Sequence, residues 1–194
     1  MSSESSEVAP IRVGPWRRRS RRTVYENAWI RVSHDEVTRP DGEPGIYGVV
    51  HFANVAVGIV ALDVDDRVLL VGQHRYTLDA WSWEVPEGGV GVDEEPLEGA
   101  RRELLEETGY TAATWHELLR FTTSNSVADE TGVLYVATDL TAGVARPDGT
   151  EELTVRWVPF DEALAMVDRG EIQDAISQIG LLRVALGRGG RAGR

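Results

Sequence analysis

One segment constrains the fold of this chain more than any other, a stretch whose pattern predicts a helix over Pro96–Thr108. Proline suits the first turn of a helix, and Gly109 suits the residue that ends one. Leu97, Ala100 and Leu104 recur at helical spacing, so they form a narrow apolar stripe along one side. We therefore expect this side of the helix to pack against a core.

The polar side of the same helix carries three carboxylates on one face. Glu103, Glu106 and Glu107 stand at positions i, i+3 and i+4, where side chains are neighbours. Three like charges there repel one another, unless a hard divalent cation such as Mg²⁺ binds them through oxygen. Arg102 can reach Glu106 at i+4, and the glycines before the helix let backbone approach a metal or a phosphate. On the glutamates alone, a solvated acidic helix is the commoner interpretation.

The spacing around the glutamates separates these two interpretations. Gly88 is followed by five residues, Glu94, seven residues and then Arg102–Tyr110, which reads RELLEETGY. This pattern resembles the Nudix box at every fixed position. The resemblance implies the fold of that family, an α+β arrangement in which helices flank a mixed β-sheet as an α/β/α sandwich. We expect an N-terminal β-hairpin extension in addition.

The resemblance also implies roles for the residues of the box. Glu103, Glu106 and Glu107 would be ligands of Mg²⁺, with Mn²⁺ as a substitute, and Glu87 would contribute its backbone carbonyl to the metal site. Arg102 would orient the glutamates and act in catalysis with Glu106 and Glu107. The family's reaction is attack of water on one phosphorus of a nucleoside diphosphate linked to another group. Metal ions would activate that water and neutralise charge on the phosphates.

Residues outside the box indicate a branch within the family. The segments Gly72–Tyr76 and Trp83–Gly89 look like the ADP-ribose pyrophosphatase branch, in which the arginine at the position of Arg75 contacts the substrate's phosphates. Glu130 matches the loop glutamate that binds metal or positions the attacking water. The competing interpretations are an ordinary surface arginine and a solvated loop acid. The pair Asn125-Ser126 replaces the Pro-Gly of the branch, which bears on ADP-ribose as substrate more than on the reaction.

Two aromatic residues of the expected hairpin are further candidates for binding substrate. In this branch, aromatic residues at places similar to Trp29 and Tyr47 stack on the nucleobase, partly across a two-fold dimer. Packing on an edge strand is an equally good explanation for both. A homodimer is expected from this resemblance and from the long hairpin.

The remaining pattern predicts strands in the first half and helices at the end. Expected strands are 29–38, 46–52, 55–62, 68–73, 82–85, 115–121, 132–138 and 153–160, a loop is expected at 86–89, and further helices at 161–169 and 172–186. We expect a flexible tail at 1–20, a β-hairpin region with a dimer contact at 21–54, the hydrolase domain at 55–186, and a second tail at 187–194.

Composition excludes several classes of function. The net charge is −12, so a general nucleic-acid surface is not expected, and all of the positive charge is arginine. An arginine cluster at 17–22 is interpreted as part of the solvated N-terminal tail. Nothing in the sequence is apolar over 18 residues, and the first residues lack the apolar region of a secretory signal. We therefore expect a cytoplasmic protein without membrane contact.

The leading functional hypothesis is a Mg²⁺-dependent pyrophosphatase for ADP-ribose or a related nucleotide sugar. It would release a nucleoside monophosphate and a sugar phosphate. Other specificities within the family, such as dinucleoside polyphosphates or NADH, are the first alternative. A module that binds a nucleotide without cleaving it is the second, although clustered carboxylates are not needed for binding alone.

Overall fold

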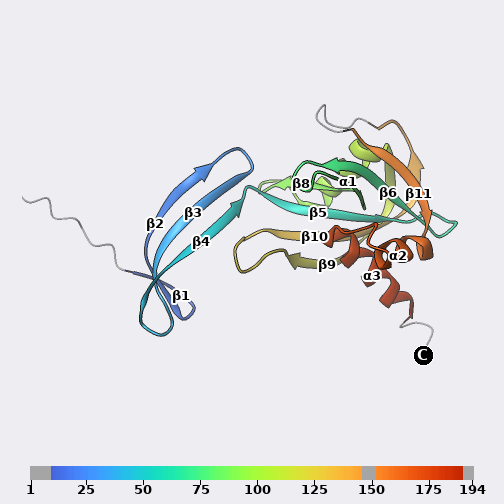
Figure 1. Cartoon of the computed structure of the whole chain (residues 1–194). Coiled ribbons are helices and arrows are strands. Elements are labelled where there is room, and N and C mark those ends of the chain that lie inside the picture. The colour runs from blue at the N-terminus through green and yellow to red at the C-terminus, as the bar shows by residue number, and fades with distance from the viewer. Residues whose placement is uncertain (1–9, 146–151, 190–194) are drawn as a thin grey trace, which may run out of the picture. The chain divides into compact units, whose positions relative to one another are not determined.

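The computed structural model describes residues 10–145 and 152–189, which belong to two compact units (Figure 1). Unit 1 comprises Met1–Asn54 together with Thr122–Glu130, and unit 2 comprises Val55–Phe121 together with Thr131–Arg194. Across the described ranges, no helix is both long enough and apolar enough to span a bilayer.

Unit 1 is built on a four-stranded antiparallel sheet in the order β1-β2-β3-β4. Its strands are β1 (Ile11–Val13), β2 (Trp16–Glu26), β3 (Ile30–Thr38) and β4 (Pro44–Phe52). The expected hairpin is confirmed, because β3 pairs with β4 across a turn in which Arg39 donates its backbone N–H to Glu43. Gly42 adopts a φ of 91° in that turn, a conformation that favours glycine.

The expectation of a tail through residue 20 is wrong for residues 11–20, which form β1, a two-residue turn and the start of β2. Two arginines of β2 contact acidic residues of β3. Arg21 donates two hydrogen bonds to Asp35, of 2.7 and 2.8 Å, and Arg19 lies 3.7 Å from Glu36. The strand is therefore stabilised by partners distant in sequence, which its own composition does not reveal. Residues 1–9 lie outside the described part of the chain.

Unit 2 contains two sheets. One has the order β8-β5-β10-β9, with β5 and β10 parallel, and the other has the order β11-β6-β7, with antiparallel pairs. The strands are β5 (Asn54–Ala61), β6 (Arg67–Arg75), β7 (Ala80–Glu84), β8 (Glu87–Gly91), β9 (Tyr110–Thr122), β10 (Thr131–Ala142) and β11 (Thr154–Pro159). The expected loop at 86–89 is wrong from residue 87 onwards, because these glycine-rich residues form β8 beside β5.

The helices of unit 2 are α1 (Pro96–Thr108), α2 (Phe160–Asp168) and α3 (Ala175–Gly189). The bounds of α1 are those expected, and Gly109 ends it with a left-handed φ of 77° while donating its N–H to Leu105. Helix α3 starts three residues later than expected and extends through 187–189, which were expected to be a tail. Residues 190–194 lie outside the described part.

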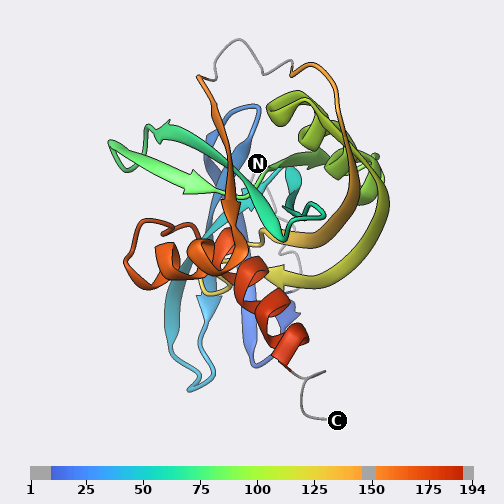
Figure 2. The same ribbon diagram turned by 90° about the vertical axis from the view of Figure 1, so that its right-hand side faces the viewer.

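Alternation along β5 shows how the helices cover opposite faces. Val57 and Ile59 belong to one buried cluster, together with Leu104 of α1. Val60 belongs to the other, together with Phe160 of α2 and with residues of α3. Since successive side chains of a strand point to opposite faces, the strands are a central layer between α1 and the α2–α3 pair (Figure 2, α1 in yellow-green, α2 and α3 in orange-red). The expected α/β/α sandwich is confirmed.

Candidate functional site

Strand β8 and helix α1 hold the candidate metal ligands. The two elements can lie close together because Gly88 of β8 has no side chain. Gly88 lies directly under the carboxylate of Glu103. A Cβ atom at this position would lie 2.2 Å from Cδ of Glu103 and 2.5 Å from each of its oxygens. Only glycine leaves room for the carboxylate to lie this close to the β8 backbone.

Arg102 links two of the glutamates to one another and to β8. Its Nη1 donates to Oε1 of Glu103 at 2.9 Å and to Oε2 of Glu106 at 3.0 Å, and its Nη2 donates to the backbone carbonyl of Gly89 at 3.2 Å. Burial lowers the pKa of Arg102, but the surrounding carboxylates, including Glu94, outweigh this and raise it. The guanidinium is therefore charged and offsets the repulsion between the glutamates.

Glu107 is the buried member of the set. Only 4% of the residue is exposed, and its Oε2 accepts a hydrogen bond of 3.1 Å from the backbone N–H of Glu87. This bond fixes a carboxylate at the start of β8, beside the backbone that the family resemblance implicates in metal binding. In the described ranges, no three or more His, Asp or Glu side chains are gathered around one point as in a formed metal site. Arg102 joins Glu103 to Glu106, and the Glu87 N–H holds Glu107 at β8.

The side chain of Glu87 is turned away from solvent. Its side chain is 13% exposed, and its Oε2 is buried without a hydrogen-bond partner in the described structure. Burial raises the pKa of Glu87 well above its ordinary value of 4.5, and the carboxylates of Asp174 and Glu84 raise it further. A buried carboxyl without a full set of partners is costly, so this position indicates a role beyond packing.

Arg75 is engaged by carboxylates of its own unit. Its Nε donates to Oε1 of Glu84 at 2.9 Å, its Nη2 donates to Oε2 of the same residue, and the same Nη2 donates to Oε1 of Glu87 at 2.8 Å. Glu84 is 3% exposed. The interpretation of Arg75 as an ordinary surface arginine is therefore wrong. Its guanidinium is bonded to two buried carboxyl groups.

The residues present fit a divalent cation. The candidate ligands are all oxygen donors, as Mg²⁺ prefers, and Glu103 lies over backbone that carries no side chain. The unpartnered Oε2 of Glu87 is a further oxygen that a cation could satisfy. The negative charge of three glutamates exceeds the single charge of Arg102, so the set keeps a net attraction for cations.

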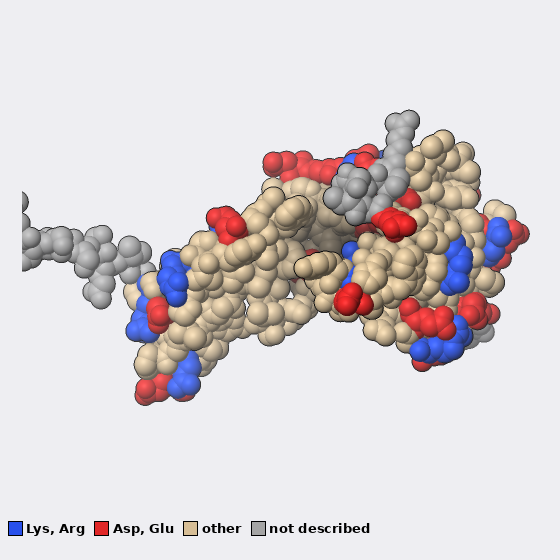
Figure 3. Space-filling view, turned by 45° about the horizontal axis from the view of Figure 1, so that its top comes forward, with Lys and Arg blue, Asp and Glu red and all other residues tan. Residues whose placement is uncertain are grey.

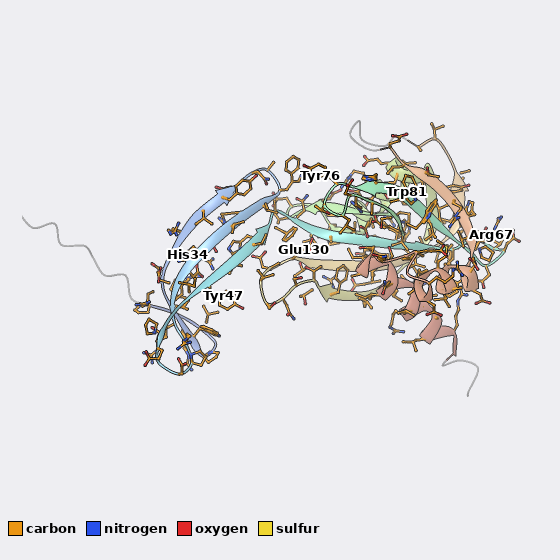
Figure 4. All side chains as sticks on the ribbon, viewed as in Figure 1. His34, Tyr47, Arg67, Tyr76, Trp81 and Glu130 are labelled. Carbon is orange, nitrogen blue, oxygen red and sulfur yellow. The ribbon has the colours of Figure 1, made fainter. Side chains whose placement is uncertain are left out.

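The other three candidates belong to unit 1. Trp29 is 70% exposed and lies just before β3, where its N–H is bonded by the side chain of Asn27. Tyr47 lies on β4, packs edge-on against Trp16 at 5.5 Å between ring centroids, and donates its hydroxyl to the carbonyl of Ser126 at 2.7 Å. Figure 4 labels Tyr47 and Glu130. The Oε2 of Glu130 accepts a hydrogen bond of 2.7 Å from Thr123.

Sequence reasoning did not identify Glu84 or the side chain of Glu87 as partners of Arg75. Strand register gives no signal for this contact, because it pairs Arg75 with Ala80 and places Glu84 opposite Val71. On the face drawn in Figure 3, arginine and acidic residues are interspersed over unit 1 and form no patch of one sign.

Comparison with known families matches two parts of the chain. Residues 53–177 match the NUDIX domain, and residues 16–50 match the nucleoside diphosphate sugar hydrolase N-terminal domain. A solved structure described as an ADP compounds hydrolase matches with a TM-score of 0.81 at 21% identity, covering 96% of this chain and 97% of that one. At this identity the likeness supports the fold.

Two curated relatives cover most of the chain. The ADP-ribose pyrophosphatase of Mycobacterium tuberculosis is 38% identical over 170 residues, which are 85% of this chain and 81% of that protein. The CMP-5'-(N-acetyl-N-hydroxy-3-aminopropyl)phosphonate hydrolase of Streptomyces rubellomurinus is 35% identical over 177 residues, 90% and 84% of the two chains. The NUDIX match spans more than half of the sequence, and α1 carries the glutamates of the box beside β8. The chain therefore belongs to the Nudix family and is a Nudix hydrolase resembling ADP-ribose pyrophosphatases.

Proposed function

We propose that this chain is a Mg²⁺-dependent pyrophosphatase that cleaves ADP-ribose or a related nucleotide sugar into a nucleoside monophosphate and a sugar phosphate. The observation that supports it best is the carboxylate of Glu103 over Gly88, beside Glu106 and Glu107 on the same helix face. Such a set of hard oxygen ligands suits a cation that also binds substrate phosphates. Mn²⁺ is expected to substitute.

The residues of this chain would divide the work of the site. Glu103, Glu106 and Glu107 would hold the cation with the backbone carbonyl of Glu87, and Arg102 would keep the glutamates oriented through its paired hydrogen bonds. When bound, divalent cations supply activation of the attacking water and neutralise charge on the bridging phosphates. Glu106 and Glu130 are the two candidates for accepting the proton of that water.

Arg75 acquires a narrower role in this proposal than the resemblance alone implies. Arg75 donates hydrogen bonds to both Glu84 and Glu87. Its first role is therefore to stabilise the segment that joins β7 to β8. Contact with a substrate phosphate is proposed as its second role. The N–H groups of Arg75 that do not bond Glu84 or Glu87 would make this contact.

The identity of the substrate is supported by the relatives and by the N-terminal match. Residues 16–50 match a domain whose description names nucleoside diphosphate sugars, and one relative is an ADP-ribose pyrophosphatase. A second relative is described as acting on a CMP-linked phosphonate, which favours a cytidine nucleotide as the alternative. Trp29, with most of its surface exposed, is the proposed stacking partner of the base.

A substrate panel tests this proposal. ADP-ribose, UDP-glucose, GDP-mannose, NADH, diadenosine polyphosphates and a CMP-linked phosphonate would be incubated with Mg²⁺ and with Mn²⁺. The expected result is release of phosphate monoesters, fastest from ADP-ribose or a nucleotide sugar. If none of these compounds is cleaved, the hydrolytic proposal fails and the nucleotide-binding module replaces it. Faster cleavage of a dinucleoside polyphosphate would change the substrate and keep the reaction.

A further inference from the structure

The segment Thr123–Glu130 is attached to the N-terminal sheet, although it is far from that sheet in sequence. The backbone N–H of Val50 on β4 donates to the carbonyl of Val127 at 2.8 Å, and the N–H of Asp129 donates to the carbonyl of Val50 at 3.1 Å. These bonds form a parallel bridge between Val50 and Ala128. Since β4 is the outer strand of its sheet, the segment extends that sheet at its edge.

A histidine of β4 reinforces this attachment with its side chain. Nδ1 of His51 lies 2.5 Å from Oδ2 of Asp129, while Oδ1 of Asp129 accepts the backbone N–H of Phe52 at 3.1 Å. The His51 side chain is only 14% exposed. Burial raises the pKa of Asp129, but the hydrogen bonds from His51 and Phe52 outweigh it and lower the pKa. Asp129 is therefore ionised and takes part in charge-assisted hydrogen bonds.

The other nitrogen of His51 is held as well. Nε2 lies 2.9 Å from Oγ of Ser33 on β3, which completes a Ser–His–Asp series. In a hydrolase such a series activates the serine as a nucleophile. Ser33 is 1% exposed, so no substrate reaches its hydroxyl. The series is instead an orienting chain, in which Ser33 fixes the imidazole and the imidazole fixes Asp129.

The residue held in this way directly precedes Glu130. Glu130 is fixed from its other side by Thr123, whose hydroxyl donates to Oε2 at 2.7 Å and whose N–H donates to the Glu130 carbonyl at 3.3 Å. The backbone on both sides of Glu130 is thus restrained within unit 1.

We propose that β4 holds the segment Thr123–Glu130 in place, and that the His51–Asp129 pair sets the conformation of Glu130. We call this pair the positioning latch. The inference rests on the proposed function, in which Glu130 serves catalysis. His51 and Asp129 do not touch substrate in this account. Their loss is expected to lower kcat about tenfold or more with KM nearly unchanged, as is typical when a partner of a functional carboxylate is removed.

Two conservative variants separate the two ends of the imidazole. The amide of an asparagine lies where Nδ1 of histidine lies, so His51→Asn can still donate to Asp129. The longer His51→Gln carries its amide where Nε2 lies, and so keeps Ser33 and loses Asp129. We expect His51→Asn to retain a kcat near that of the parent protein and His51→Gln to lose it. Asp129→Asn is a second way to weaken the latch while keeping the oxygen that accepts the Phe52 N–H.

A matched control lies on the same sheet. His34 on β3 forms an exposed pair with Glu36 at 3.1 Å, and His34→Gln should leave kcat unchanged (Figure 4). Amide hydrogen exchange gives a readout independent of turnover. Exchange at Asp129, whose N–H is bonded to Val50, should become faster in His51→Gln and stay slow in His51→Asn and in His34→Gln.

The outcomes distinguish the latch from the proposed function. Slow turnover in both Glu130→Gln and His51→Gln, with His51→Asn near the parent rate, supports the latch. An inactive Glu130→Gln beside a fully active His51→Gln overturns the latch and leaves the role of Glu130 intact. If Glu130→Gln turns over at the parent rate, the role of Glu130 is wrong and the latch has no catalytic residue to position.

Discussion

Substituting Gly88 by alanine should disturb the metal site while leaving the fold nearly unchanged. The new Cβ would lie 2.2 Å from Cδ of Glu103, closer than atoms can approach. The atom that must move is the end of a flexible side chain, so the carboxylate can rotate away without moving backbone. The cost therefore falls on the position of a candidate metal ligand more than on the stability of the protein.

The size of the effect follows from the contact. Forcing an extra methyl into a packed position typically costs about 1–3 kcal/mol. This energy must be supplied whenever Glu103 adopts the conformation that binds metal. Activity at limiting metal should therefore fall roughly 5- to 150-fold, because each 1.36 kcal/mol is a factor of about ten. Gly91→Ala is the matched control, since it lies on the same strand and a Cβ there meets nothing within 4 Å. Replacing glycine by alanine also makes the unfolded chain less flexible, which raises the free energy of unfolding by about 0.4–1 kcal/mol in both variants.

The assay is the initial rate of substrate hydrolysis as a function of Mg²⁺ concentration, with thermal unfolding measured in parallel. Gly88→Ala should need more Mg²⁺ for half-maximal rate, whereas Gly91→Ala should behave like the parent protein. The reasoning is refuted if the two variants show the same dependence on Mg²⁺. A Gly88→Ala protein that is unfolded would contradict the claim that Glu103 absorbs the clash.

Two further predictions concern ion pairs in the two units. Arg75→Ala should lower the free energy of unfolding, measured in urea, by roughly 3 kcal/mol, because it leaves the buried Glu84 carboxylate without its cation. The control Arg120→Ala, at an exposed arginine, should change this free energy little. A rise in KM with unchanged stability would instead identify Arg75 chiefly as a phosphate ligand. In unit 1 the hydrogen bonds from Arg21 lower the pKa of Asp35 below its ordinary value of 3.8, so its contribution to stability is complete above pH 3.8 and is lost as the pH falls through the lower, folded-state pKa. Asp35→Asn should therefore be less stable than the parent at pH 7, with the difference in unfolding free energy shrinking below pH 3.8, and a difference independent of pH would show that charge is not the cause.

The helix that carries the candidate ligands could be predicted from the sequence because its signals are local. Pro96 at the start and Gly109 at the end mark α1 within the segment itself, and the spacing of Glu103 and Glu107 fixes which face they share. The continuous apolar run of β5 similarly indicates a strand that is buried on both faces. Each of these features depends on residues a few positions apart.

The features that sequence reasoning missed depend on partners far along the chain. Strand β2 is rich in arginine and is stabilised by Asp35, and the glycine-rich β8 is a strand because β5 lies beside it. The bond between His51 and Asp129 joins residues 78 positions apart, and no local pattern marks either residue. Arg75 resembles a phosphate ligand in sequence, whereas its bonds to Glu84 and Glu87 are side-chain contacts that only the folded structure shows.

Glu107→Gln tests most directly whether the carboxylates of α1 hold the cation that supports pyrophosphate cleavage. A glutamine oxygen can still accept the hydrogen bond from the Glu87 N–H, so the fold should be retained. The measurement is Mg²⁺-dependent release of a nucleoside monophosphate and a sugar phosphate from the best substrate of the panel. We predict both products from the parent protein and almost none from a folded Glu107→Gln variant. Turnover of the variant at the parent rate would contradict the assignment of this helix as the metal site.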